Sequence, residues 1–239
     1  MAGAHQWSVE LRGHRYDLEL VARVFGSPDC RVHERGGRYF ASSTKFDMLE
    51  AGGDVLDTAS TLVDQINAAM GLRHGGFQSI SLGAAFDGDP LYKGATHIRL
   101  SETIKSTARL FPPTISQAGV PPPAEDDRAA QYVRLAQSDP EVAAVLRFLR
   151  DDEPSTFDIG KVIDDIIGKR TIVKKGWATE AEVSSCLGSI NNDKVMGTAA
   201  RHALSPQDAP RKPMDLAQAR DFAKAIACKF LDWRVAGRP

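Results

Sequence analysis

The sequence predicts an α+β protein in which an N-terminal antiparallel sheet with one or two helices precedes an all-α C-terminal helical bundle. Three observations support this. The first half of the chain alternates apolar and polar side chains, as over 7–11 and 16–20, with the period of two expected of half-buried strands. Beyond residue 126, apolar residues recur every three or four positions, as in amphipathic helices. Residues 112–125 contain five prolines without periodicity, which predicts an extended linker. We therefore expect an α+β domain over 1–111, a linker over 112–125 and a helical bundle over 126–239.

The predicted sheet begins with two hairpins. Residues 7–11 and 16–20 alternate on either side of Gly13-His14, which predicts the first hairpin. The sequence signal for the second hairpin is stronger. Residues 31–35 and 38–42 flank Gly36-Gly37, a pair that tolerates the positive φ of a tight turn.

The apolar period changes to three and four after Gly52-Gly53. This predicts a helix over 54–71, laid on the sheet, with Asp54 as its N-cap. Two more strands, over 78–86 and 95–101, and a short helix over 102–110 complete the predicted domain.

Capping residues mark the starts of the predicted C-terminal helices. Asp139-Pro140 is an N-cap followed by a proline at the first helical position. Ser155 opens a very apolar helix that Gly168 ends. Thr179 and Asp215 each precede a Glu or Gln three residues later, the spacing of a capping box. About five helices with short connections are expected, the last over 215–233.

Composition excludes several classes of protein. A net charge of −1 provides no global attraction to nucleic acid or anionic lipid. The sequence shows neither a secretory signal nor a long apolar run, so we expect a cytoplasmic protein without a membrane partner. Three widely spaced cysteines predict buried thiols in a reducing compartment. No phosphate-loop, dinucleotide, nucleophile-elbow or His-rich zinc motif is present, so we expect no cofactor and no metal.

One candidate site lies near the C-terminus, where Asn191-Asn192 and then Arg201-His202 precede the last helix. An imidazole exchanges protons near neutral pH, and a guanidinium binds phosphate or carboxylate bidentately. Arg201 and His202 are therefore candidate catalytic residues, with Asn191 and Asn192 as binding residues. The structural alternative is that the asparagines cap a helix, Arg201 pairs with an acid of the bundle and His202 bonds a backbone carbonyl.

A second candidate site is the basic second hairpin, with Arg31, His33, Arg35 and Arg38 as binding residues. Such donors suit the phosphates of a nucleotide or nucleic acid, and an exposed Phe40 or Tyr16 would stack on bases. The alternative is that these charges are simply solvated.

The C-terminal pattern resembles a widespread bacterial family of uncharacterised proteins. The resemblance spans most of the chain. It is carried by Leu11-Arg12-Gly13-His14, Ile66-Asn67 with Ala69, Lys174-Lys175-Gly176-Trp177-Ala178, Asn191 or Asn192, Arg201-His202, Pro213-Met214, Leu216, Ala219-Arg220 and Leu231-Asp232-Trp233. More loosely, an Arg/His turn before a final amphipathic helix is similar to HEPN-type helical bundles of RNA-cleaving toxins and defence proteins. Those nucleases have four to six residues between the Arg and the His, whereas Arg201 and His202 are adjacent.

The leading interpretation is a bacterial cytoplasmic binding or regulatory protein, not an enzyme, whose ligand is a protein, a nucleotide or RNA. The alternative is a divergent HEPN-like, metal-independent ribonuclease in stress or phage defence, with His202 as acid/base and Arg201 stabilising a phosphate. The apolar helices that start at 139 and 155 also predict a homo-oligomer in which Phe148, Ile163 or Ile167 meets a second copy.

Overall fold

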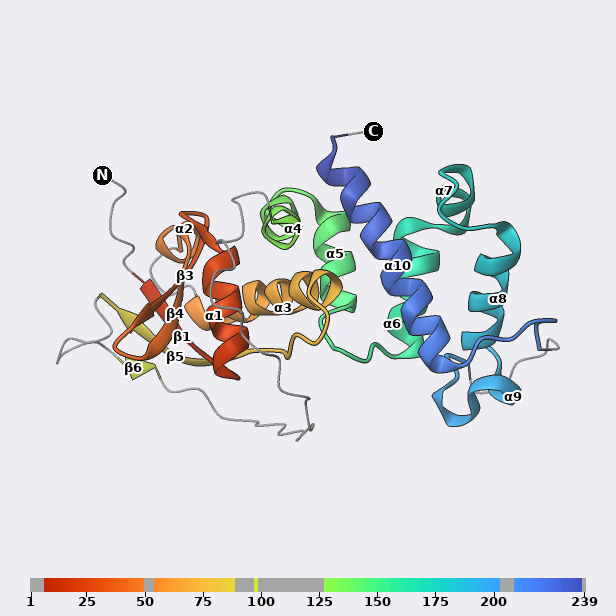
Figure 1. Cartoon of the computed structure of the whole chain (residues 1–239), viewed down its shortest axis with the longest axis horizontal. Helices are drawn as coiled ribbons and strands as arrows, with labels where there is room; N and C mark the ends of the chain where they lie inside the picture. Colours follow the sequence, from red (N-terminus) through yellow and green to blue (C-terminus); the bar gives the residue numbers. More distant parts are fainter. Residues whose placement is uncertain (1–6, 50–53, 89–96, 99–126, 203–208, 238–239) are drawn as a thin grey trace, which may run out of the picture. The chain divides into compact units, whose positions relative to one another are not determined.

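The computed structural model describes residues 7–49, 54–88, 97–98, 127–202 and 209–237, and it confirms the α+β class (Figure 1). The chain divides into two compact units. The sheet unit comprises Met1–Ala59 and Ser81–Asp127, and the helical unit comprises Ser60–Ile80 and Arg128–Pro239. The predicted linker over 112–125 and the predicted helix over 102–110 lie outside the described residues.

The sheet is six-stranded and antiparallel, with the order β2-β3-β4-β1-β5-β6. Its strands are β1 Trp7–Arg12, β2 Gly26–Ser27, β3 Cys30–Arg35, β4 Arg38–Ser42, β5 Ser81–Asp87 and β6 His97–Ile98. The second predicted hairpin is confirmed as β3 and β4. Gly36 and Gly37 have φ of 59° and 76°, so the turn needs glycine or a residue that tolerates the left-handed region.

The first predicted hairpin is wrong, because β1 is followed by the helix α1, Arg15–Val24. The buried residues of α1 are Leu18, Val21 and Val24, which recur every three positions and so form one helical face. The alternating stretch over 16–20 is too short to distinguish the period of a strand from the period of a helix. Tyr16, which the hairpin interpretation placed beside Leu18 on an apolar face, is exposed.

A short helix, α2 (Thr44–Asp47), follows β4, and the predicted helix over 54–71 is confirmed as α3 (Val55–Arg73). Asp54 caps α3, since its Oδ1 accepts hydrogen bonds from the backbone N–H groups of Leu56 at 2.8 Å and Asp57 at 3.2 Å. From Ser60 onward, however, α3 belongs to the helical unit. Residues 62–70 are buried on nearly every side. The predicted packing of this helix on the sheet stays a prediction for its part beyond Ala59.

The helical unit contains more and shorter helices than the five predicted. They are α4 Arg128–Ala136, α5 Pro140–Phe148, α6 Thr156–Gly160, the π-helix η1 Lys161–Ile167, α7 Lys169–Lys174, α8 Glu180–Ile190, α9 Asp193–Met196, the 3₁₀ turn η2 Gly197–Ala199 and α10 Leu216–Val235. The capping boxes at Thr179 and Asp215 are confirmed, and Ser155, which was predicted to start a helix, forms a third capping box with Asp158. The last helix, α10, packs against α4, α5, α6, α8 and η1 (Figure 1).

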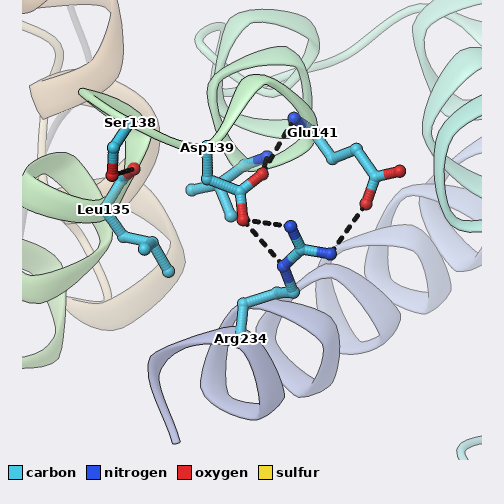
Figure 2. A network of polar contacts seen from close by, with 6 residues as sticks. Leu135, Ser138, Asp139, Glu141 and Arg234 are labelled. Carbon is cyan, nitrogen blue, oxygen red and sulfur yellow. Dashed lines mark hydrogen bonds and ion pairs between the residues drawn. The ribbon is translucent and has the colours of Figure 1, made fainter. Parts of the chain in front are cut away.

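The predicted cap at Asp139 is also confirmed and belongs to a larger network (Figure 2). Its Oδ1 accepts from the backbone N–H groups of Glu141 at 3.0 Å and Val142 at 3.2 Å. Its Oδ2 accepts from Arg234, whose Nε lies at 2.7 Å and whose Nη2 also contacts it. Arg234 Nη1 reaches Glu141 Oε2 at 2.9 Å. One carboxylate thus caps α5 and fastens the end of α10 to it.

The apolar residues that suggested an oligomer lie inside the helical unit. Ile163 is fully buried and Ile167 nearly so, because η1 packs against α5, α8 and α10. These two side chains therefore do not form a surface for a second copy, and Phe148 alone of the three remains partly exposed. None of the helices in the described ranges has the length and apolar character needed to cross a membrane.

Candidate functional site

The side chain of Arg201 is mostly buried and contacts other residues of the helical unit. Its backbone N–H donates to Ile190 O at 2.8 Å, and its side chain is 15% exposed. The guanidinium lies on Gly160, where an added Cβ would come within 2.6 Å of Arg201 Nη1. Nη1 is 3.9 Å from Asp164 Oδ2, and Nη2 is 3.7 Å from Asp165 Oδ2. Arg201 thus packs against α6 and pairs with two acids of η1.

The other predicted residues of this region lie in different environments. Asn192 is 1% exposed and caps α9, with its Oδ1 accepting from Lys194 N at 2.9 Å. Asn191 ends α8, and its buried Oδ1 has no hydrogen-bond partner among the described residues. His202 is exposed. Arg201 is mostly buried and His202 is exposed, so the two adjacent side chains lie in different environments.

The basic residues of the sheet unit are arranged differently. Four of them lie on one face of the β3–β4 hairpin, and we call them the basic hairpin face: Arg31, His33, Arg35 and Arg38. Successive side chains of a strand alternate between its two faces, so the first three share a face of β3. Arg38 lies directly opposite Arg35 in the register. Arg31 and Arg35 are exposed, and His33 and Arg38 are partly exposed.

Arg38 is fixed in place on this face. Its Nε donates to Glu10 Oε1 at 2.8 Å, and its guanidinium carbon lies 5.2 Å from the ring centre of Phe40 and 5.5 Å from that of Phe86. Burial alone would raise the pKa of Glu10, but the hydrogen bond and charge of Arg38, with the charge of Arg12, outweigh burial and lower that pKa. Glu10 is therefore ionised at neutral pH and orients Arg38.

The expected use of Phe40 for base stacking is wrong. Phe40 is fully buried, with its ring centre 5.9 Å from that of Phe86 and 6.1 Å from that of His33. Tyr16 is 68% exposed, but it belongs to α1 and lies beside His14. Phe40 instead serves as the surface on which Arg38 rests. Sequence reasoning missed that Phe40 supports the Arg38 side chain and that Glu10 orients it. The register of β1 and β4, which places Glu10 opposite Phe40, reveals both contacts.

Cysteine and metal chemistry find no support in the described residues. Burial raises the pKa of the Cys30 and Cys186 thiols to about 12, so both are protonated at neutral pH. Across the described ranges, no group of three or more His, Cys, Asp or Glu side chains could hold a metal ion.

Comparison of the chain with protein-family models, with curated proteins and with solved structures finds no match in any of the three.

Proposed function

We propose that this protein is a non-catalytic binding or regulatory protein and that its basic hairpin face binds an anionic ligand. The observation that carries the proposal is the cross-strand pair of Arg35 and Arg38. Like charges directly opposite one another on neighbouring strands are unfavourable for folding. Glu10 pairs with Arg38, and the exposed Arg31 lies on the same face. We infer that an anion binds where these guanidinium groups gather.

The setting of this protein is part of the same proposal. The resemblance to a bacterial family supports a bacterial origin, and three cysteines that are all free as thiols support a reducing, cytoplasmic compartment.

The ribonuclease alternative is the weaker proposal. A nuclease arginine must approach a phosphate, whereas Arg201 lies within 4 Å of two carboxylates that would repel one. Labelled RNA should therefore stay intact with the purified protein, and His202→Ala should change nothing in that assay.

The binding proposal is tested with the full-length chain and three anionic probes: inorganic phosphate, ATP and a labelled RNA oligonucleotide. We expect the double variant Arg31→Gln/Arg35→Gln to weaken binding at least tenfold, which corresponds to about 1.4 kcal/mol. Its matched control is Arg23→Gln/Lys45→Gln, which removes two exposed charges from other elements of the sheet unit. Equal losses in both variants, or no binding of any probe by the parent protein, would reject the proposal.

A further inference from the structure

We propose that the outward side of α7 is a docking surface for an acidic, partly apolar peptide segment of a partner protein. This surface belongs to the helical unit and is separate from the basic hairpin face. The inward side of α7 carries Ile172, which is fully buried. Because a helix turns by about 100° per residue, Arg170 and Lys174 project opposite Ile172, and Val173 lies beside them. We call Arg170, Val173 and Lys174 the α7 outer face.

The α7 outer face is accessible to a partner. Arg170 and Lys174 are exposed, and Val173 is 37% exposed. Among the described residues, neither of the two basic side chains has a hydrogen bond or an ion pair. The neighbouring Lys169, in contrast, lies 3.1 Å from Glu180 Oε1. The fold therefore compensates the charge of Lys169 but not the charges of Arg170 and Lys174.

The charges of α7 oppose the usual preferences of a helix. Its first turn contains no acid and carries Lys169 and Arg170, where the positive end of the helix dipole disfavours cations. Arg170 and Lys174 are like charges four positions apart, a spacing that destabilises a helix. The N-cap residue, Gly168, makes no side-chain hydrogen bond. Departures from local preference without a structural gain are expected where a surface serves function.

The fold fixes α7 from its buried side. The helix ends at Gly176, whose φ is 69° and whose N–H donates to Val173 O at 3.0 Å. The next N–H, that of Trp177, donates to Ile172 O at 3.0 Å, which completes a Schellman motif. The ring of Trp177 then packs edge-on against Trp233 of α10, with 5.9 Å between the ring centres. A surface fixed in this way loses little freedom when a partner docks.

The chemistry of the α7 outer face favours an acidic peptide over a nucleic acid. Carboxylates of a peptide can pair with Arg170 and Lys174 while an aliphatic side chain covers Val173. A phosphodiester backbone leaves Val173 uncovered, and this face contains no aromatic ring on which a base could stack. The expected occupant therefore combines Glu or Asp with an aliphatic residue.

The experiment measures the fluorescence anisotropy of a labelled twelve-residue peptide of glutamate and leucine with the full-length chain in low salt. The comparison peptides have glutamine in place of glutamate or serine in place of leucine. We expect the parent peptide to bind at least tenfold more tightly than the glutamine peptide and about threefold more tightly than the serine peptide.

Variants of the protein locate the binding. Arg170→Gln/Lys174→Gln should lower the affinity for the glutamate–leucine peptide at least tenfold, and Val173→Ser should lower it about threefold. The matched control is Arg211→Gln/Lys212→Gln, which removes two exposed charges from another part of the helical unit and should leave the affinity unchanged.

Arg170→Glu separates a binding role from a structural one. It places an acid in the first turn of α7, four residues before Lys174, an arrangement that stabilises a helix. The variant should therefore melt about 1 °C higher than the parent protein while its affinity for the peptide falls at least tenfold. A lower melting temperature would assign Arg170 to the fold and overturn the proposal.

The remaining outcomes also decide between occupants. Equal binding of the glutamine peptide, or no binding of the glutamate–leucine peptide, would overturn the proposal. Loss of affinity for a labelled oligouridylate in Arg170→Gln/Lys174→Gln would instead indicate a nucleic acid. Self-association of the parent protein that light scattering no longer detects in this variant would indicate a second copy. None of these variants alters the basic hairpin face, so each result leaves the proposed function of that face unaffected.

Discussion

Arg38 in the sheet unit and Arg201 in the helical unit are both paired with acids, yet their surroundings differ in charge. Arg38 has one carboxylate, Glu10, and a second arginine opposite it, whereas Arg201 has two aspartates within 4 Å. The side chain of Arg38 is 40% exposed and that of Arg201 only 15%. An arginine whose acids outnumber it is satisfied by the fold. The number of acids around an arginine, more than the residue type, therefore indicates how far the fold itself satisfies that arginine.

The largest effect should come from the helical unit, where polar side chains serve the fold. Asp139→Ala removes the cap of α5 and leaves Arg234 with Glu141 as its remaining acidic partner. The free energy of unfolding should therefore fall by about 2–4 kcal/mol. The matched variant is Glu141→Ala, which removes an exposed partner of the same arginine and should cost at most about 1 kcal/mol. Urea unfolding of both variants measures the difference. Equal losses would show that the cap contributes nothing.

Arg201→Ala should have the next largest effect on stability. It removes a mostly buried side chain that packs on Gly160 and pairs with two aspartates, at a cost of about 1–2 kcal/mol. The adjacent His202→Ala should stay within about 0.5 kcal/mol, because His202 is exposed. Thermal melts of the two variants compare them directly. An Arg201→Ala protein of normal stability that loses its biological effect would return Arg201 to the list of functional residues.

The pH dependence of the Glu10–Arg38 pair follows from the lowered pKa of Glu10. A carboxyl whose pKa is lower in the folded state stabilises the protein above its unfolded pKa, near 4.5, and loses that contribution as the pH falls through the folded value. Glu10→Gln should therefore cost about 1 kcal/mol at pH 7 and almost nothing near pH 2, which melts at both pH values measure. A difference that persists unchanged in acid would mean that Glu10 acts through packing alone.

The smallest stability change, and the one of opposite sign, is expected on the basic hairpin face. Arg35→Gln removes a like charge opposite Arg38 and should raise stability by a few tenths of a kcal/mol in low salt. The gain should shrink in 1 M salt, where charges separated by more than about 3 Å are screened. Melts at the two salt concentrations test this. A loss of stability in low salt would place Arg35 among the structural residues.

Local signals in the sequence predicted local structure well. The capping residues at Asp139, Ser155, Thr179 and Asp215 were readable because a cap depends on residues at most three positions away. The Gly36-Gly37 turn was readable for the same reason.

The features that the sequence did not predict depend on contacts between residues far apart in the chain. The membership of α3 in the helical unit depends on partners such as Gln137, which bonds Gln65 across 72 positions. The side chain of Arg201 is placed by Gly160, and that of Arg38 by Glu10, 28 positions away. Neither partner is marked by a motif, so the environment of each candidate arginine emerged only from the folded chain.

The contact between Gly160 and Arg201 has an evolutionary consequence. Because the guanidinium occupies the volume that a Cβ at position 160 would need, a substitution there shifts the flexible end of the arginine, which is the part that pairs with Asp164 and Asp165. In descendants of this sequence, loss of the glycine should therefore accompany loss of these ion pairs.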